Sequence, residues 1–359
     1  MKKDGALLRM NIPRQRGLSL VELMVSLTIG LILLAGLSLL FVESSRSHRE
    51  LSEASKQIEN GRYALQLLTD DLHVAGFYGH FANLSTIPTP VAAPDPCEVG
   101  STSAMYDALP IYIQGYAAAS FTAKPAVSTL CGAASLLTAA NLQPGSDVFA
   151  IRRADTNALA VGATAVNQET YIQASGSAEI QRGAGNAITN TSKADGVTNT
   201  DIFLRGVAAP IRKYRVHVYF VAPCSMPANG GSVCTGANDD GGRPIPTLKR
   251  LELTVAGGTP KMSIVSLVEG IEMLKIDYGI DLLPNPNVNN TVGDGAPEIP
   301  FVRVPATPAN WADVMGADLY ILSRNPQLTT GHIDAKTYAM GLAGNYAPGG
   351  NFKRHLYSA

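Results

Sequence analysis

Residues 16–22 read Arg-Gly-Leu-Ser-Leu-Val-Glu and open an apolar run that continues to Val42. Between Leu18 and Val42 the only charged side chain is Glu22. Placing a charged side chain in hydrocarbon costs at least ~2.5 kcal/mol, so an intramembrane carboxylate indicates a functional site with a partner that pairs with it. The group that pairs with Glu22 is therefore the main clue to function in this sequence.

A basic leader precedes the apolar run. Its net charge is 5 − 1 = +4, from Lys2, Lys3, Arg9, Arg14 and Arg16 against Asp4. Because positive charge stays on the cytoplasmic side, the N-terminus is expected to face the cytoplasm and the rest of the chain the periplasm. As a helix the run would be about 37 Å long, enough to cross a bilayer. A secretory signal has an apolar region of only about 7–15 residues followed by an Ala-x-Ala-like site, which is absent here.

A plain signal anchor would explain the span and its orientation, but it would not explain Gly17 at the border or Glu22 five residues later. These residues resemble the N-terminus of type IV prepilins and type II pseudopilins. The resemblance implies that a prepilin peptidase cleaves after Gly17 and that the new N-terminal residue, Leu18, is methylated. The family usually has Phe at that first mature position. It also implies that Glu22 pairs with the N-terminal amine of a neighbouring subunit in a fibre.

A helical pattern continues past the apolar run, without proline as far as Tyr78. Apolar residues recur every seven positions, with a companion row beside them: Leu51, Ile58, Leu65, Leu72; Ala54, Gly61, Leu68, Ala75. This stripe predicts an amphipathic helix whose apolar side is an ordinary core face. We therefore expect one helix from Leu18 to Tyr78, ended by Gly76 and Gly79.

The predicted organisation is a cleaved leader (1–17), a membrane or fibre-core half of the helix (18–42), an amphipathic half (43–78) and a periplasmic head (79–359). In the head, apolar and polar residues alternate over 212–221, 250–255 and 274–280, and further strands are expected at 147–153 and, after a short helix near Trp311, at 317–323. Half-buried strands of this kind predict an antiparallel sheet with one face on the helix, an α+β pilin-like fold. Residues 82–96 are expected to form a loop, and 154–200 loops with short strands.

Four cysteines follow the membrane segment: Cys97, Cys131, Cys224 and Cys234. None forms a C-x-x-C pair, which argues against a zinc site, and a periplasmic head would be in an oxidising compartment. Four cysteines allow three pairings, of which proximity in sequence favours Cys97–Cys131 and Cys224–Cys234. Free buried thiols are the alternative.

Patterns for enzyme chemistry and for cofactors are absent from the sequence: it lacks H-E-x-x-H, G-x-S-x-G, Walker A and G-x-G-x-x-G. We therefore expect no enzyme activity, cofactor or metal. Without the leader the formal charge falls from −1 to about −5 (−1 − 4), which argues against broad DNA binding. Two Asn/Asp-rich stretches, 238–240 and 285–294, are interpreted as surface turns rather than calcium loops.

Basic side chains on the polar faces of two expected strands are interpreted as a solvated surface rather than a DNA-binding patch: Arg212, Lys213, Arg215, Lys249 and Arg250. His217 lies on the same polar face and receives the same interpretation.

Three later stretches are similar to minor pilins of the PilW kind: 61–79, 267–281 and 311–324. The resemblance implies a low-abundance, non-enzymatic subunit that primes type IV pilus assembly in a complex near the tip. Its implied partners are the prepilin peptidase, the inner membrane and other minor and major pilins, with a tip adhesin as a further candidate. It would reside in the inner membrane as a single-pass protein before entering the fibre on the cell surface, with twitching motility as an associated role. The alternatives are a type II secretion pseudopilin and a membrane-anchored periplasmic binding protein or enzyme.

Overall fold

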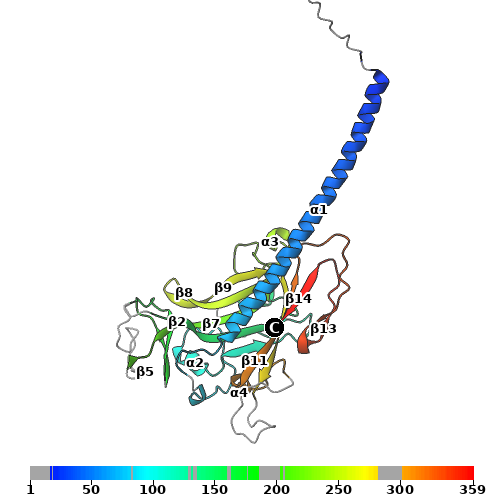
Figure 1. Ribbon diagram of the computed structural model, residues 1–359. Helices are drawn as coiled ribbons and strands as arrows, with labels where there is room; N and C mark the ends of the chain where they lie inside the picture. Colours follow the sequence, from blue (N-terminus) through cyan, green and yellow to red (C-terminus); the bar gives the residue numbers. More distant parts are fainter. Residues whose placement is uncertain are drawn as a thin grey trace, which may run out of the picture. The chain divides into compact units, whose positions relative to one another are not determined.

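A long N-terminal helix and a β-rich head make up the computed structural model (Figure 1). It describes residues 17, 19–81, 84–127, 131, 136–159, 163–175, 177–185, 203–204, 207–281 and 301–359. The chain divides into two compact units, Met1–Ser52 and Glu53–Ala359, and helix α1 (Leu20–His73) contributes to both. The predicted α+β architecture, in which a long helix packs on antiparallel strands, is confirmed.

The helix ends five residues earlier than expected, at His73 instead of Tyr78. After it the chain turns, and Gly76 adopts a φ of 73° while its N–H donates to the carbonyl of Arg152. A left-handed glycine just past a helix is a common C-terminal stop. At Gly76 a side chain is also excluded by space, because a Cβ would lie 2.9 Å from the ring of Tyr112.

The larger sheet has seven strands, each antiparallel to its neighbours. The order is β1-β2-β7-β3-β4; β8 pairs with the same edge of β7 as β3 but further along the strand, and β9 pairs with β8. The bounds are β1 Ile113–Tyr116, β2 Val148–Ala158, β3 Thr170–Ala174, β4 Ala178–Arg182, β7 Ile211–Ala222, β8 Thr247–Ala256 and β9 Thr259–Glu269. Strands β3 and β4 fall in the region where mainly loops were expected.

A second sheet of three antiparallel strands, in the order β10-β11-β14, follows in the sequence: β10 Ile271–Ile280, β11 Val314–Arg324 and β14 Arg354–Ser358. The head thus has two main sheets where one was expected. The described residues also form two short hairpins and three short α-helices: β5 Phe203–Leu204 with β6 Val207–Ala208, β12 Tyr338–Ala339 with β13 Asn345–Tyr346, α2 Thr102–Asp107, α3 Asp239–Gly242 and α4 Pro308–Ala312. Single 3-10 turns lie at Leu84–Thr86, Ala139–Asn141 and Gly341–Ala343.

Both faces of β7, in the middle of the larger sheet, are buried from Val216 onward. Tyr214, Val216, Val218 and Phe220 join a core that includes the four cysteines. The opposite face contributes Tyr219 and Val221 to a second core, which also holds residues of α1, β10 and β11. The expected alternation along β7 is therefore present, but the second face is not solvated.

The buried face of α1 differs from the predicted stripe. Leu51 and Ile58 are 64% and 49% exposed. The buried residues are instead Gln57, Gly61, Ala64, Leu68 and Asp71, at spacings of three and four. Gly61 and Leu68, from the companion row of the predicted stripe, therefore lie at the centre of the contact. The polar residues Gln57 and Asp71 lie at its two ends.

Candidate assembly site

The N-terminal motif lies on an open surface. Gly17 is exposed, and a Cβ built on it would meet nothing within 4 Å. Glu22 is exposed in the first turn of α1. Leu18 lies outside the described residues. Among the described residues, none forms an ion pair with Glu22.

The apolar segment that follows Glu22 is also uncovered. From Leu20 to Val42 every large apolar side chain is at least half exposed. Hydroxyl groups within the segment are satisfied locally: Ser26 donates to the carbonyl of Glu22 at 2.7 Å and Ser38 to that of Leu34 at 2.8 Å. Internal satisfaction of polar groups is what hydrocarbon requires. Among the described residues, α1 is the one helix long and apolar enough to cross a membrane.

Asp71 ties the other end of α1 to the larger sheet. One carboxylate oxygen accepts from Arg153 Nε of β2 at 2.7 Å. The other accepts from the Tyr219 hydroxyl of β7 at 2.7 Å and lies 2.6 Å from His217 Nδ1. Three strand side chains from two strands therefore converge on one helix carboxylate.

The protonation states in this cluster follow from burial and from these contacts. Burial alone would raise the pKa of Asp71, but the hydrogen bonds and positive charge around it lower the pKa well below its usual range. Burial lowers the pKa of His217, in spite of the opposing effect of Asp71. At neutral pH we therefore assign a neutral His217 that donates its Nδ1–H to an ionised Asp71. His217 Nε2 is buried and has no described partner.

The interpretation of His217 as solvated is therefore wrong: its side chain is only 4% exposed. The basic side chains near it do not form a free patch either. Arg215 pairs with Asp155 at 2.7 Å, and Arg250 pairs with Glu252 at 2.7 Å. Lys249 is buried and donates to the carbonyl of Ser225. Lys213 contacts Glu169, and Arg212 donates to backbone carbonyls of residues 155 and 156.

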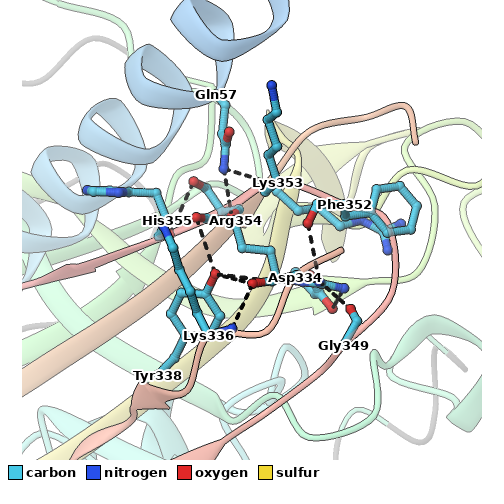
Figure 2. Close-up of polar contacts among 12 residues, drawn as sticks. Gln57, Asp334, Lys336, Tyr338, Gly349, Phe352, Lys353, Arg354 and His355 are labelled. Carbon is cyan, nitrogen blue, oxygen red and sulfur yellow. Dashed lines mark hydrogen bonds and ion pairs between the residues drawn. The ribbon is translucent and has the colours of Figure 1, made fainter. Parts of the chain in front are cut away.

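Gln57 anchors α1 to the second sheet. Its side-chain amide donates to the carbonyls of Ser323 in β11 and Lys353 just before β14, both at 3.1 Å (Figure 2). One turn further along, Gly61 packs against the Tyr357 ring so closely that a Cβ would lie 2.1 Å from Cε2. The amide and the glycine together allow the helix to approach β14.

A buried ionic network lies behind this contact (Figure 2). Arg354 pairs with Glu272 of β10 at 2.6 Å and with Asp334 at 3.0 Å, and Asp334 also accepts from the Tyr338 hydroxyl at 3.1 Å. All four side chains are buried, and buried charges persist when they are paired and hydrogen-bonded. The network fixes the segment between β11 and β14 to the sheet.

A second buried network corrects the expectation for β10. Lys275 and Asp277 were placed on a polar face, but both are 1% exposed. Lys275 pairs with Asp147 at 3.0 Å, and Arg303 bridges Asp147 and Asp277 at 2.6 and 2.9 Å. The two cations and two carboxylates neutralise each other, which allows the polar side chains of β10 to be buried. This strand is therefore buried on both faces.

The structure forms two disulfides, Cys97–Cys131 and Cys224–Cys234, which is the pairing that proximity favoured. The sulfur atoms are therefore not metal ligands. Near the first disulfide, Asp95 accepts from the backbone N–H groups of both cysteines at 2.8 and 3.3 Å.

The stretch 238–240 beside the second disulfide is not a simple surface turn, because Asp239 is buried. Asp239 accepts from the N–H groups of Ala228, Thr235 and Gly236, and Asp240 accepts from those of three further residues: Ser225, Met226 and Ile245. These carboxylates organise a loop and leave little capacity for a cation. The other Asn/Asp-rich stretch, 285–294, lies outside the described residues.

The sequence reasoning missed the anchoring residues Gln57, Asp71 and Tyr357. The available signal was the position of Gln57 and Asp71 in register with Gly61, Ala64 and Leu68. Polar residues at both ends of an apolar helical row can mark hydrogen bonds to the partner surface rather than the edge of a core.

Comparison with known protein families gives two matches. Residues 234–359 match the family described as Type IV Pilus-assembly protein W, and residues 12–38 match the Prokaryotic N-terminal methylation motif. The second range contains Gly17 and Glu22. The first contains the stretches 267–281 and 311–324 and the Arg354 network, while the similar stretch 61–79 lies outside both ranges. No curated protein and no solved structure matches the chain.

Proposed function

We propose that this chain is a minor pilin that acts in a tip-located complex to prime the fibre, because residues 234–359 match the PilW family of type IV pilus-assembly proteins and residues 12–38 match the N-terminal methylation motif. The observation that supports this proposal most directly is the exposed Glu22 in the first turn of an uncovered apolar helix. The family match also favours a type IV pilus over a type II secretion system, and a structural role over an enzymatic one.

The proposed mechanism begins in the inner membrane. A prepilin peptidase cuts after Gly17 on the cytoplasmic side and leaves Leu18 with a free amine, which is then methylated. During assembly the 20–42 helix exchanges lipid for the helices of other pilins. Glu22 pairs with the cationic N-terminal amine of a neighbouring subunit, because a carboxylate moving into an apolar fibre core needs an opposite charge.

The head is suited to the periplasm, where disulfides persist. Its two disulfides and two buried ionic networks hold long irregular segments in place. In the proposed complex this head contacts other minor pilins, and a tip adhesin is a further candidate partner.

The test compares Glu22→Ala with Glu43→Ala, an exposed carboxylate on the same helix just beyond the apolar run. The measured quantity is the ratio of this protein in sheared pili to that in the membrane. Breaking a buried charge pair costs about 3–5 kcal/mol, and each 1.4 kcal/mol is tenfold, so Glu22→Ala should lower the ratio at least about tenfold. Glu43→Ala should retain the wild-type ratio.

Mass spectrometry of the mature N-terminus separates processing from assembly. Both variants should begin at a methylated Leu18. Cleavage at another position, or an intact leader, would contradict the prepilin proposal. Normal incorporation of Glu22→Ala into pili would contradict the pairing role alone.

A further inference from the structure

A groove of about 670 Å³ lies between the C-terminal end of α1 and the first half of β11. Its floor is apolar and includes Leu72, Tyr112 and Leu319. Leu72 and Tyr112 also pack against the second core, so an occupant of the groove would extend that core. Apart from His73 at the rim and the carboxyl end at Ala359, the lining residues are uncharged, which favours uncharged side chains on whatever enters.

One wall of the groove is an unpaired strand edge. Strand β14 covers only the second half of β11, from Tyr320 to Arg324, and the ladder closes with reciprocal backbone bonds between Leu319 and Ala359 at 2.7 and 3.2 Å. Towards its start, β11 pairs with β10 on one side. Within the described residues no strand pairs with residues 315–318 on the other side.

The backbone groups of Ala317 point to this free edge. In an antiparallel ladder, successive residues direct their N–H and C=O groups alternately to the two sides. Leu319 directs them to Ala359, so Ala317, two residues away, directs them to the same side. Its partner on β10, Tyr278, confirms the alternation, because Tyr278 exchanges both backbone bonds with Val302 on the far side, at 2.8 Å.

Strand β9, at an edge of the larger sheet, carries residues that oppose pairing. This strand begins with Thr259-Pro260-Lys261. Proline and charged residues are the usual protection of exposed edges. The edge at 315–318 reads Met-Gly-Ala-Asp: it has no proline, its one charged residue is Asp318 at the end next to the paired part, and Met315 is 52% exposed.

We propose that this groove binds an extended segment of another pilin subunit, added to β11 antiparallel and in line with β14. This inference rests on the proposed function. The free backbone groups of Ala317 select a strand rather than a helix, since a helix has no free donors along its side. The uncharged lining requires small or apolar side chains at the alternate positions that face Leu72 and Tyr112. A second copy of this chain is a poor donor through β9, because that edge strand carries Pro260 and Lys261.

The test places a photo-crosslinking amino acid at position 315 or, in a second strain, at position 73 on the opposite rim of the groove. Each full-length protein is made in cells that assemble pili, and position 226, exposed but outside the groove, is the control. The expected adduct joins position 315 or 73 to a different processed pilin. Peptide mapping should place it in an extended segment with alternating uncharged residues.

Two variants, each made in the strain with the crosslinking amino acid at position 73, then test the strand edge and the groove lining. Ala317→Pro removes the N–H at the free edge, and Met315→Lys puts a charge in the groove at an exposed position. Each should reduce the adduct at least tenfold, whereas Ala317→Ser, which keeps the N–H, should not. Met315→Lys keeps the test informative if Ala317→Pro unfolds the head.

Each contrary result has a defined meaning. If the wild-type protein is found in pili but gives no adduct at 315 or 73, the groove proposal is wrong and the minor-pilin proposal stands. An adduct only to a second copy, or one unaffected by both Ala317→Pro and Met315→Lys, also overturns the groove proposal. If the protein is absent from pili altogether, the proposed function fails and this inference fails with it.

Discussion

Asp71 places a carboxylate on a helix face that is otherwise apolar, and three side chains from the sheet satisfy it. The pair with His217 is the most sensitive part of this contact. His217 has one ring nitrogen bound to Asp71 and the other buried without a described partner. Arg153 and Arg250 both face it and disfavour its protonation.

The lowered pKa of His217 predicts a pH dependence with a defined sign. A histidine whose folded pKa lies below its unfolded value of 6.5 contributes stability above that value and loses it as pH falls through 6.5. The free energy of unfolding of the full chain in detergent should therefore fall between pH 7.5 and 5.5. Asp71 does not titrate in this window, since its pKa lies far below it.

Replacing His217 with Gln isolates this contribution, because the amide can still donate to Asp71 but does not titrate. The His217→Gln variant should lose less stability over the same pH interval than the wild type. His80→Gln, at an exposed position, is the control and should retain the wild-type dependence. Equal pH profiles for wild type and His217→Gln would refute the assignment.

The close packing of residues 53–73 of α1 against the second sheet requires that position 61 has no side chain. In an exposed helix, Gly to Ala would stabilise by up to ~1 kcal/mol. At Gly61 the new Cβ would overlap the Tyr357 ring, and overpacking typically costs ~1–3 kcal/mol.

Gly61→Ala should therefore destabilise the protein, measured as a lower midpoint of chemical unfolding. Gly36→Ala is the matched control, since a Cβ there meets nothing within 4 Å. In a Tyr357→Ala background, where the ring that the new Cβ would overlap is gone, Gly61→Ala should cause little further destabilisation. A stable Gly61→Ala single variant would mean that the helix does not approach β14 this closely.

The whole molecule divides at Ser52 and Glu53 into two compact units, and the second contains all the anchoring residues of α1. Residues 53–359, exported behind a secretory signal, should therefore form a soluble head with both disulfides. A version that starts at residue 74 lacks Gly61, Ala64 and Leu68, and it uncovers the second core.

The version that starts at residue 74 should aggregate or be degraded, because large apolar surfaces are not tolerated on soluble proteins. Periplasmic yield and resistance to protease measure the difference between the two forms. Equal yield and resistance would show that the 53–73 helix is dispensable for the head.

Local pattern was sufficient for several features. The glycine, the apolar run and Glu22 indicated the prepilin motif directly, because those signals lie within a few residues of each other. Alternation located the strands β7, β8 and β10, an apolar run located β11, and proximity in sequence indicated both disulfide pairs. By contrast, the burial of the polar faces of β7 and β10 could not be predicted from the sequences of those strands.

The sequence by itself determined the prepilin motif, the membrane-length helix and the α+β class, since each depends on periodicity or spacing along the chain. The tertiary structure decided which face of α1 packs, why His217 and Lys275 are buried, and where an edge of β11 stays open. The reason is that a charged side chain is stable inside only when its partner is present. Asp71 and His217 are 146 residues apart, so no local pattern could pair them.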